Sequence, residues 1–284
     1  MLPRAWPRAA LHFSMFSKLP TLVLFLGSAS SASAMALPSS ALTALRTRGF
    51  AVLPDWLPPT GVIAVKRDVV ALRREGRFAA AGVGDAKTNR MDESVRSCEQ
   101  CFLFPQLTHS YGGDQAGRAL LYGSLSGLAS DLQQSTGTPL DGLLTEGLFA
   151  YYPDGGFYKR HIDSVLGTAS EIREFSYLLY LNEGWEPGDG GELRIHTDGG
   201  TELAPPAAAP SYVDVPPRAG TLVLFESTLP HEVLETNCER LAVAGWFNRP
   251  VAGSTERRTL ITTLAGALVV GGVAKLALAV LGGD

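Results

Sequence analysis

The stretch YYPDGGFYKRHID, residues 151–163, ends in a His-x-Asp pair formed by His161 and Asp163. Residues i and i+2 of a strand point to the same face, so this imidazole and this carboxylate can converge on one divalent metal ion. A second such pair, His196 and Asp198, occurs further along the chain. A third ligand is needed to decide which pair binds metal.

His231, in TLPHEV, follows the apolar stretch TLVLFES and supplies that ligand. Four candidate strands separate Asp163 from His231, enough to wind around a barrel and return, whereas only two separate Asp198 from it. We therefore predict that His161, Asp163 and His231 bind the metal, and that His196 ends a strand and faces solvent. Two histidines and one carboxylate are typical of non-haem Fe(II), although zinc in a hydrolase could use the same ligands.

Arg240 begins the segment RLAVAGWF, in which alternate residues share a face. An arginine inside a barrel is costly unless it binds an anion, and its planar fork suits a carboxylate. Tyr180, in SYLLYLN, could add a hydroxyl to the same anion. This pattern favours iron with a dicarboxylate over zinc. The alternative is a surface Arg240 paired with Glu235 or Glu239.

The elements that must position these residues are short strands after a helical region. Val62, Val65, Val69 and Leu72 recur at helical spacing, and the leucines of 114–135 form a second apolar stripe. Before them, residues 40–57 predict a short helix, a stop at glycine and a strand. Turn residues then separate strands predicted at 148–152, 157–162, 175–182, 191–196, 211–215, 221–226, 231–235 and 240–247.

This order predicts an α+β protein with a mainly β core: a double-stranded β-helix, or jelly roll, with supporting N-terminal helices. Residues 37–146 are predicted as the helical support of the catalytic domain, and 147–250 as the barrel itself. The formal net charge of −4, with 18% charged residues, argues against nucleic-acid binding. Cys98 and Cys101 are predicted to be ordinary thiols, because no second pair completes a zinc site.

The two ends of the chain differ from its middle in composition. Residues 1–36 lack acidic side chains and combine basic and Ser-rich residues with a short apolar run, as in a signal or transit peptide. Residues 259–281 form a hydrophobic tail, and LITTLAGALVVGGVAKLALAVL (260–281) is long enough to cross a bilayer. The alternative is a helix packed on the domain. The expected location is an organelle, with attachment to a membrane through this tail.

The motifs YYPDGGFYKRHID, YLLYLNEGW, GGELRI, TLVLFES, PHEV and RLAVAGWF occur in the order of a known family. Over about 147–248 the chain resembles the Fe(II)/2-oxoglutarate-dependent dioxygenases, and among them the prolyl 4-hydroxylases. The arginine nine residues after the distal histidine is similar to that of the oxygen-sensing prolyl hydroxylases.

The resemblance implies an enzyme in which His161, Asp163 and His231 hold Fe(2+). It also implies that Arg240 and Tyr180 bind the distal carboxylate of 2-oxoglutarate, and that Tyr152 lines the pocket. O2 and ascorbate are the implied further cofactors, the loop 164–174 borders the substrate groove, and the partner is a protein or peptide with a target proline. The alternatives are a hydroxylase of another residue or a small metabolite, and a non-catalytic metal-binding barrel.

Overall fold

The structure is a computed structural model of the chain and describes residues 37–84, 90–103, 112–142, 144, 146–197 and 211–251. These residues belong to one compact unit, Ala34–Asp284. The predicted targeting segment, 1–36, and the predicted tail, 259–281, lie outside the described residues and stay predictions. Within the described ranges, no helix combines the length and the hydropathy that a membrane span requires.

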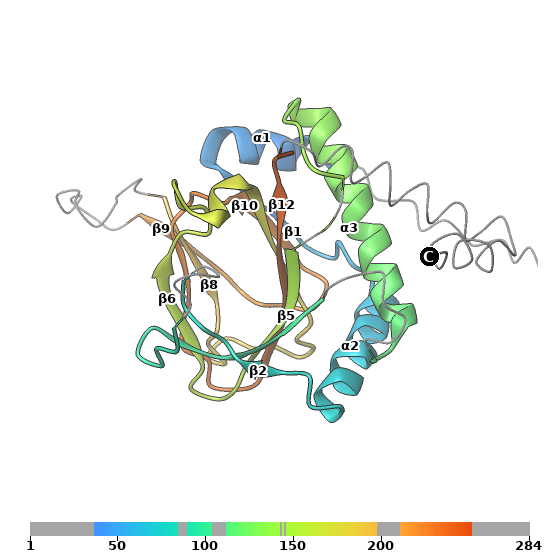
Figure 1. Cartoon of the computed structure of the whole chain (residues 1–284), viewed down its shortest axis with the longest axis vertical. Coiled ribbons are helices and arrows are strands. Elements are labelled where there is room, and N and C mark those ends of the chain that lie inside the picture. The colour runs from blue at the N-terminus through green and yellow to red at the C-terminus, as the bar shows by residue number, and fades with distance from the viewer. Residues whose placement is uncertain are drawn as a thin grey trace, which may run out of the picture. The chain divides into compact units, whose positions relative to one another are not determined.

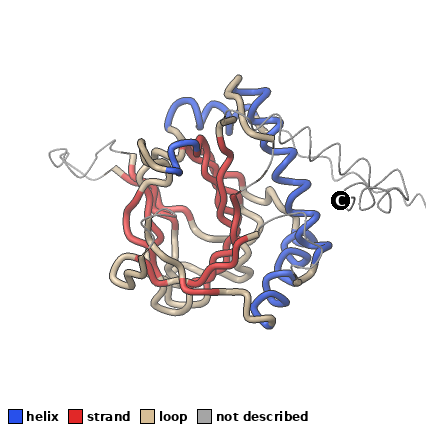
Figure 2. Tube along the Cα trace, viewed as in Figure 1, coloured by secondary structure: helices blue, strands red, loops and turns tan. Residues whose placement is uncertain are grey.

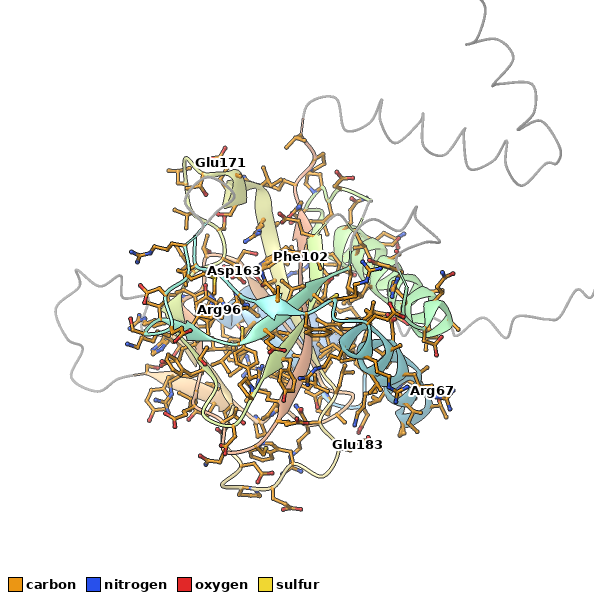
Figure 3. All side chains as sticks on the ribbon, turned by 60° about the horizontal axis from the view of Figure 1, so that its bottom comes forward. Arg67, Arg96, Phe102, Asp163, Glu171 and Glu183 are labelled. Atoms are coloured by element: carbon orange, nitrogen blue, oxygen red, sulfur yellow. The ribbon has the colours of Figure 1, made fainter. Side chains whose placement is uncertain are left out.

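The described α-helices are α1 (Ser39–Arg48), α2 (Pro59–Arg74) and α3 (Gln115–Thr136). The two predicted apolar stripes are buried, and each fully buried leucine contributes about 1.5–3 kcal/mol. The opposite side of α2 carries charged residues together with the exposed Ile63 and Val70, and Arg67 points away from the sheets (Figure 3). The Asp114 side chain caps α3 by accepting a hydrogen bond from the Ala116 N–H at 3.1 Å. The predicted helices are therefore confirmed.

Twelve strands form two antiparallel sheets among the described residues. The seven-stranded sheet has the order β1-β10-β7-β12-β5-β4-β2 and the five-stranded sheet the order β3-β6-β11-β8-β9. The bounds in the first sheet are β1 Phe50–Leu53, β2 Ala79–Ala80, β4 Glu99–Phe102, β5 Glu146–Tyr152, β7 Arg173–Tyr180, β10 Leu222–Glu226 and β12 Arg240–Asn248. Those in the second are β3 Arg96–Ser97, β6 Phe157–His161, β8 Leu193–His196, β9 Tyr212–Val215 and β11 His231–Val233.

From β5 to β12 the chain crosses repeatedly between the sheets: β5, β7, β10 and β12 lie in one, and β6, β8, β9 and β11 in the other. This winding makes a double-stranded β-helix, which confirms the predicted fold. The helices lie beside the seven-stranded sheet and away from β6, β8 and β9 (Figures 1 and 2). One side of that sheet therefore packs on helices, and the other faces the interior of the barrel.

Strand β7 shows how alternation separates these two sides. Tyr177 and Leu179 pack in the large apolar cluster that includes the helices. Tyr180 packs in a second cluster with side chains of the five-stranded sheet. Because successive side chains of a strand point to opposite faces, Ser176 and Tyr180 share the interior side.

The region predicted as helical support, 37–146, differs from the prediction because it also contributes strands to both sheets. β1 pairs with β10, β4 pairs with β5, and β3 pairs with β6. The pairing of β1 agrees with the strand predicted after the first helix. β2 and β3 have two residues each, which is too short for an alternating pattern, so only their tertiary pairing defines them.

Candidate active site

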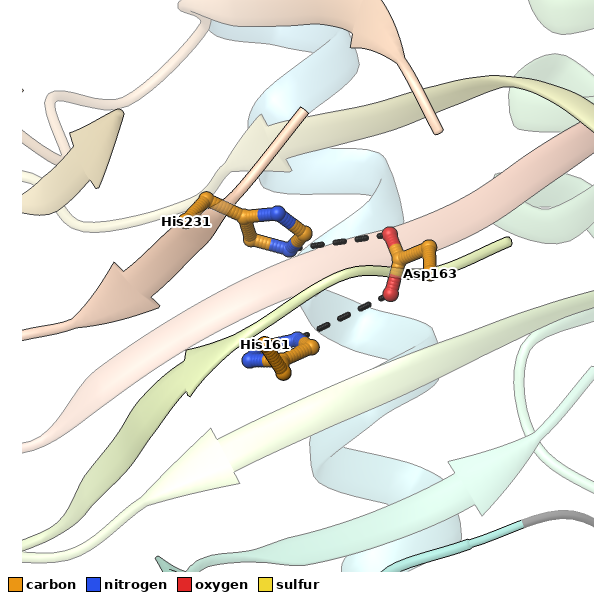
Figure 4. Close-up of side chains that lie close together, drawn as sticks. All are labelled: His161, Asp163 and His231. Carbon is orange, nitrogen blue, oxygen red and sulfur yellow. Dashed lines mark ion pairs between the residues drawn. The ribbon is translucent and has the colours of Figure 1, made fainter. Parts of the chain in front are cut away.

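The three predicted metal ligands come together at one point of the barrel. His161 ends β6 and lies directly opposite His231, the first residue of β11, while Asp163 follows β6 by two residues. Nε2 of His161 lies 3.6 Å from Oδ1 of Asp163, and Nε2 of His231 lies 3.6 Å from Oδ2 (Figure 4). All three ligand atoms lie within 4.8 Å of one another. This spacing fits a single metal ion.

Backbone carbonyl groups orient both imidazoles. Nδ1 of His161 lies 2.8 Å from the Lys159 carbonyl oxygen, and Nδ1 of His231 lies 2.9 Å from that of Leu229. Each Nδ1–H can donate to its carbonyl, so each Nε2 presents a lone pair towards Asp163. This is the tautomer that a metal ligand needs.

Two hydroxyl groups support the carboxylate between the histidines. The Ser176 hydroxyl donates to Oδ2 of Asp163 at 2.7 Å and lies 2.9 Å from the Ser227 hydroxyl. Burial alone would raise the pKa of Asp163, but the neighbouring histidines and Ser176 together lower it. Burial, with His231 beside it, lowers the pKa of His161 to about 3. At neutral pH the site therefore offers a neutral imidazole and a charged carboxylate, the forms that bind a metal.

A second polar group lies deeper in the barrel, where β5, β12 and β7 are neighbours. Arg240 is 1% exposed and Tyr180 is fully buried. Cζ of Arg240 lies 5.2 Å from the centre of the Tyr180 ring and 4.8 Å from that of Tyr152. Within the described residues, both terminal guanidinium nitrogens of Arg240 and the Tyr180 hydroxyl lack a hydrogen-bond partner. Three buried donors thus converge without an acceptor.

Gly191 explains how Arg240 is held. Nε of Arg240 donates to the Gly191 carbonyl oxygen at 2.7 Å. Gly191 has φ near 73°, and a Cβ there would come 2.9 Å from Cδ of Arg240. A glycine is needed on both counts. This contact uses Nε and leaves the two terminal nitrogens for a ligand.

The alternative that places Arg240 on the surface is contradicted, because Arg240 is 1% exposed. Arg240 forms no ion pair with a described residue, and Glu239 instead accepts a hydrogen bond from the Tyr151 hydroxyl at 2.6 Å. Burial raises the pKa of Tyr180 to about 12 even though Arg240 opposes the shift, so its hydroxyl remains a donor at neutral pH. A cation and a neutral hydroxyl fit a carboxylate, because a buried unpaired charge is otherwise strongly unfavourable.

The sequence profile of the 2OG-Fe(II) oxygenase superfamily matches residues 147–248. This range contains all three metal-ligand candidates as well as Arg240, Tyr180 and Tyr152. These residues are therefore similar to that superfamily. Its members' requirement for Fe(2+), 2-oxoglutarate and O2 agrees with the donor set described above.

Two curated relatives that match this chain are hydroxylases. A Hypoxia-inducible factor prolyl hydroxylase of Caenorhabditis elegans is 24% identical over 212 residues, 72% of this chain and 27% of the relative. A PKHD-type hydroxylase of Parvibaculum lavamentivorans is 32% identical over 114 residues, 40% of this chain and 46% of the relative. The chain thus spans less than half of the length of either one.

Solved structures resemble a larger share of this chain. A Pseudomonas putida prolyl-4-hydroxylase is 29% identical, with a TM-score of 0.58, covering 75% of this chain and 98% of its own. A Trichoplax adhaerens prolyl hydroxylase, solved with a hypoxia inducible factor oxygen degradation domain peptide fragment, is 23% identical with a TM-score of 0.59. It covers 78% of this chain and 90% of its own, and supports the fold.

A cavity of about 650 Å³ opens onto the three candidate metal ligands. Tyr152 lines it, as predicted, and also faces Arg240. The loop 164–174, predicted to border the substrate groove, contributes several lining residues, among them Val165 and Thr168. The cavity therefore joins the candidate metal centre to the predicted substrate side.

His196 takes no part in the triad, but the prediction that it faces solvent is wrong. It is 9% exposed, and its Nε2 lies 3.0 Å from Oε1 of Glu232. β8 lies between β11 and β9, so His196 is flanked on both sides and its ring meets Tyr212 edge-on. In the sequence, His196 looks exposed because it ends a strand just before a long loop. In the structure, the strands that pair on both sides of β8 bury it.

Sequence reasoning missed several polar residues around the cavity. Strand alternation could have placed Ser176 in the barrel, because it precedes Tyr180 by four residues and so shares its strand face. Arg173, whose Nε donates to Glu146 at 2.9 Å, and Arg96 also line the cavity. Neither arginine has a local sequence signal, since each reaches the cavity through the pairing of distant strands.

Proposed function

We propose that this chain is an iron(II)- and 2-oxoglutarate-dependent dioxygenase that hydroxylates prolyl residues of a protein or peptide and releases succinate and CO2. The observation that carries the proposal is the presence of two complementary sites in one barrel. One is a set of two imidazoles and a carboxylate, with ligand atoms within 4.8 Å. The other is the group of unpaired buried donors on Arg240 and Tyr180.

In this proposal His161, Asp163 and His231 would hold Fe(2+) through two imidazoles and one carboxylate, a ligand set typical of non-haem iron. Bound iron, with 2-oxoglutarate and O2, supplies the oxidant that converts a C–H bond to C–OH. The carbonyls that orient the histidines and the serine that supports Asp163 keep the ligands in place.

Arg240 and Tyr180 bind the distal carboxylate of the co-substrate, the first through its planar fork and the second through its hydroxyl. Tyr152 covers the guanidinium on the cavity side, with its ring centre 4.8 Å from Cζ. A dianion bound there satisfies donors that the fold leaves unpaired. A zinc hydrolase does not require a carboxylate site beside its metal. The combination of the metal ligands with the Arg240 and Tyr180 donors therefore favours oxygenase chemistry.

The choice of a prolyl substrate is supported by the names of the relatives, which include prolyl hydroxylases. The cavity of about 650 Å³ is large enough to admit a peptide segment. Hydroxylation of another residue or a small metabolite is the alternative on the same scaffold. A non-catalytic barrel is disfavoured because every position of the proposed mechanism is filled.

The test is turnover by the purified full-length chain. Succinate release should require Fe(II), O2 and 2-oxoglutarate, and should increase with proline peptides whose mass then rises by one oxygen. Zinc in place of iron should give no release. Turnover of small acids without modification of any peptide would support the metabolite hydroxylase instead. Binding of iron and 2-oxoglutarate with no succinate from any mixture would support the binding protein.

Ascorbate dependence and location remain parts of the proposal. We expect ascorbate to prolong turnover by keeping the iron reduced. We also propose that residues 1–36 direct the chain to an organelle and that 260–281 attach it to a membrane. The full chain should then resist carbonate extraction, whereas a chain ending at residue 258 should be released. Release of both would contradict the membrane attachment.

A further inference from the structure

Arg96, like Arg173, lies in the cavity at the candidate metal centre. β3 pairs with β6 so that Arg96 lies opposite Tyr158. Cζ of Arg96 lies 4.5 Å from the centre of the Tyr158 ring, and that ring stacks on His161 with the centres 3.6 Å apart. Arg96, Tyr158 and His161 all line the cavity. One aromatic ring therefore separates the guanidinium from a candidate iron ligand.

The guanidinium of Arg96 has no carboxylate partner. Its Nε donates to the Cys98 thiol at 3.0 Å, and one terminal nitrogen donates to the Gly82 carbonyl oxygen at 3.3 Å. Within the described ranges no acidic side chain comes within ion-pair distance of it. Its neighbours are therefore a thiol, a backbone carbonyl and a tyrosine ring rather than a carboxylate.

Arg173, which lines the same cavity, shows the contrast. Two of its nitrogens contact Glu146, at 2.9 and 3.3 Å, and a third donates to the Asp163 carbonyl oxygen. Its guanidinium also lies 3.7 Å from the Trp246 ring. The charge of Arg173 is thus balanced within the fold, whereas that of Arg96 is not. Figure 3 labels Arg96 together with Asp163 and Phe102, which line the same cavity.

We propose that Arg96 is a specificity residue that binds a carboxylate of the substrate, so that the enzyme prefers peptides with an acidic residue near the target. This inference rests on the proposed function. The co-substrate already has Arg240 for its distal carboxylate, which leaves Arg96 for the main substrate. Cζ of Arg96 lies 4.5 Å from the centre of the Tyr158 ring, which lies 3.6 Å from that of His161. Because an extended peptide advances about 3.3 Å per residue, the acidic residue should lie within about three residues of the target.

Apolar side chains on the loop after β6 add to this preference. Ile162 and Val165 line the cavity and are 39% and 42% exposed, and the neighbouring Leu166 is 92% exposed. A substrate that carries an apolar residue as well as an acid can cover these side chains while its carboxylate meets Arg96. Basic residues near the target should be disfavoured, because they would approach an unbalanced guanidinium.

The experiment uses the full-length chain and matched synthetic peptides. Each peptide has a central proline in an Ala/Gly background and one Asp at a position from three before to three after it. Matched peptides carry Asn or Lys there. Hydroxylation is measured by mass spectrometry as kcat/KM. The wild type should prefer Asp to Asn at one position by about 10- to 100-fold, the effect of one charge-assisted hydrogen bond.

Three variants test whether Arg96 causes this preference. Arg96→Gln should bring the Asp-to-Asn ratio close to one, mainly by lowering kcat/KM for the Asp peptide. Arg96→Lys should keep part of the preference, and Arg96→Glu should transfer it to the Lys peptide. The control is Arg90→Gln, which removes the same charge from an arginine whose side chain is 69% exposed and paired with Asp92. It should leave the wild-type ratio unchanged.

A binding measurement separates this inference from the proposed function. The same peptides, and N-acetylproline as a small carboxylic acid, are titrated calorimetrically into the full-length chain loaded with Mn(II) and N-oxalylglycine. If no peptide is hydroxylated, the proposed function fails, and Arg96-dependent binding of the Asp peptide or the small acid still supports a carboxylate site. If the Asp-to-Asn ratio is the same in the wild type and in Arg96→Gln, for both hydroxylation and binding, the inference is overturned. A raised KM for 2-oxoglutarate with every peptide would also overturn it, because Arg96 would then serve the co-substrate.

Discussion

Arg118 and Arg240 are both buried, at 9% and 1% exposure, yet the fold treats their charges differently. Arg118 joins α3 to α2: its Nε donates to one oxygen of Asp68 at 2.9 Å and a terminal nitrogen donates to the other at 2.6 Å. The same terminal nitrogen donates to the Gly112 carbonyl at 3.0 Å. Among the described residues, Arg240 inside the barrel has only the Gly191 carbonyl as an acceptor, which its Nε contacts.

The difference separates a structural charge from a functional one. A buried arginine whose fork is filled by a carboxylate of its own chain has nothing left to bind. A buried arginine whose guanidinium has no acceptor destabilises the protein. An anion that binds there removes this destabilisation, which adds to its binding free energy. On this argument the helical side of the seven-stranded sheet contributes stability, whereas the barrel side contributes binding.

The largest expected effect comes from removing the carboxylate of the metal centre. Asp163→Ala should abolish both iron binding and succinate release, because two histidines alone leave the metal without its anionic ligand. Iron content and succinate formation are the measurements. Asp214→Ala is the matched control: it removes a carboxylate that pairs with Arg194 at 2.8 Å, and activity should persist. Full turnover by folded Asp163→Ala would contradict the assignment of the triad.

Replacing Arg118 tests the structural half of the comparison. Arg118→Met should lower the free energy of unfolding by about 3–5 kcal/mol, because Asp68 is left buried without its cation. Urea denaturation measures this change, and KM for 2-oxoglutarate of the folded variant should not change. Arg240→Met, measured without co-substrate, should lose no stability. Equal losses in both variants would remove the distinction between the two arginines.

Replacing Arg240 tests the functional half. Arg240→Lys keeps the charge but loses the planar fork and the Nε contact, so binding should weaken by about 1.5–3 kcal/mol. KM for 2-oxoglutarate should rise about 10- to 100-fold, and more in Arg240→Ala. Iron content should not change in either variant. An unchanged KM would show that the unpaired donors do not hold the co-substrate.

The smallest effect is expected at His196, which the fold pairs with Glu232 outside the triad. His196→Ala should cost about 1 kcal/mol of stability, the typical value of one hydrogen bond, and leave most turnover intact. Thermal unfolding and the succinate assay measure the two quantities. Loss of turnover in a folded variant would mean that the wrong His-x-Asp pair has been assigned to the metal.

The sequence allowed the barrel and its site to be predicted where spacing carries the information. The alternation in β7 and β12 placed Tyr180 and Arg240 in the barrel, and the count of strands selected His161 over His196. Two-residue strands could not be predicted, because pairing with β4 and β6 alone defines them. For the same reason Arg96 was missed: its place in the cavity depends on β3 lying beside β6.

The interior side of β7 supports both halves of the proposed site. Ser176 holds the carboxylate of Asp163 at 2.7 Å, and Tyr180 lies beside Arg240. Four residues of extended strand, about 13 Å, separate them. Because β7 is hydrogen-bonded to β10 on one side and β12 on the other, this separation is fixed. The protein should therefore select its keto acid by carbon number, rejecting oxaloacetate as too short and 2-oxoadipate as too long.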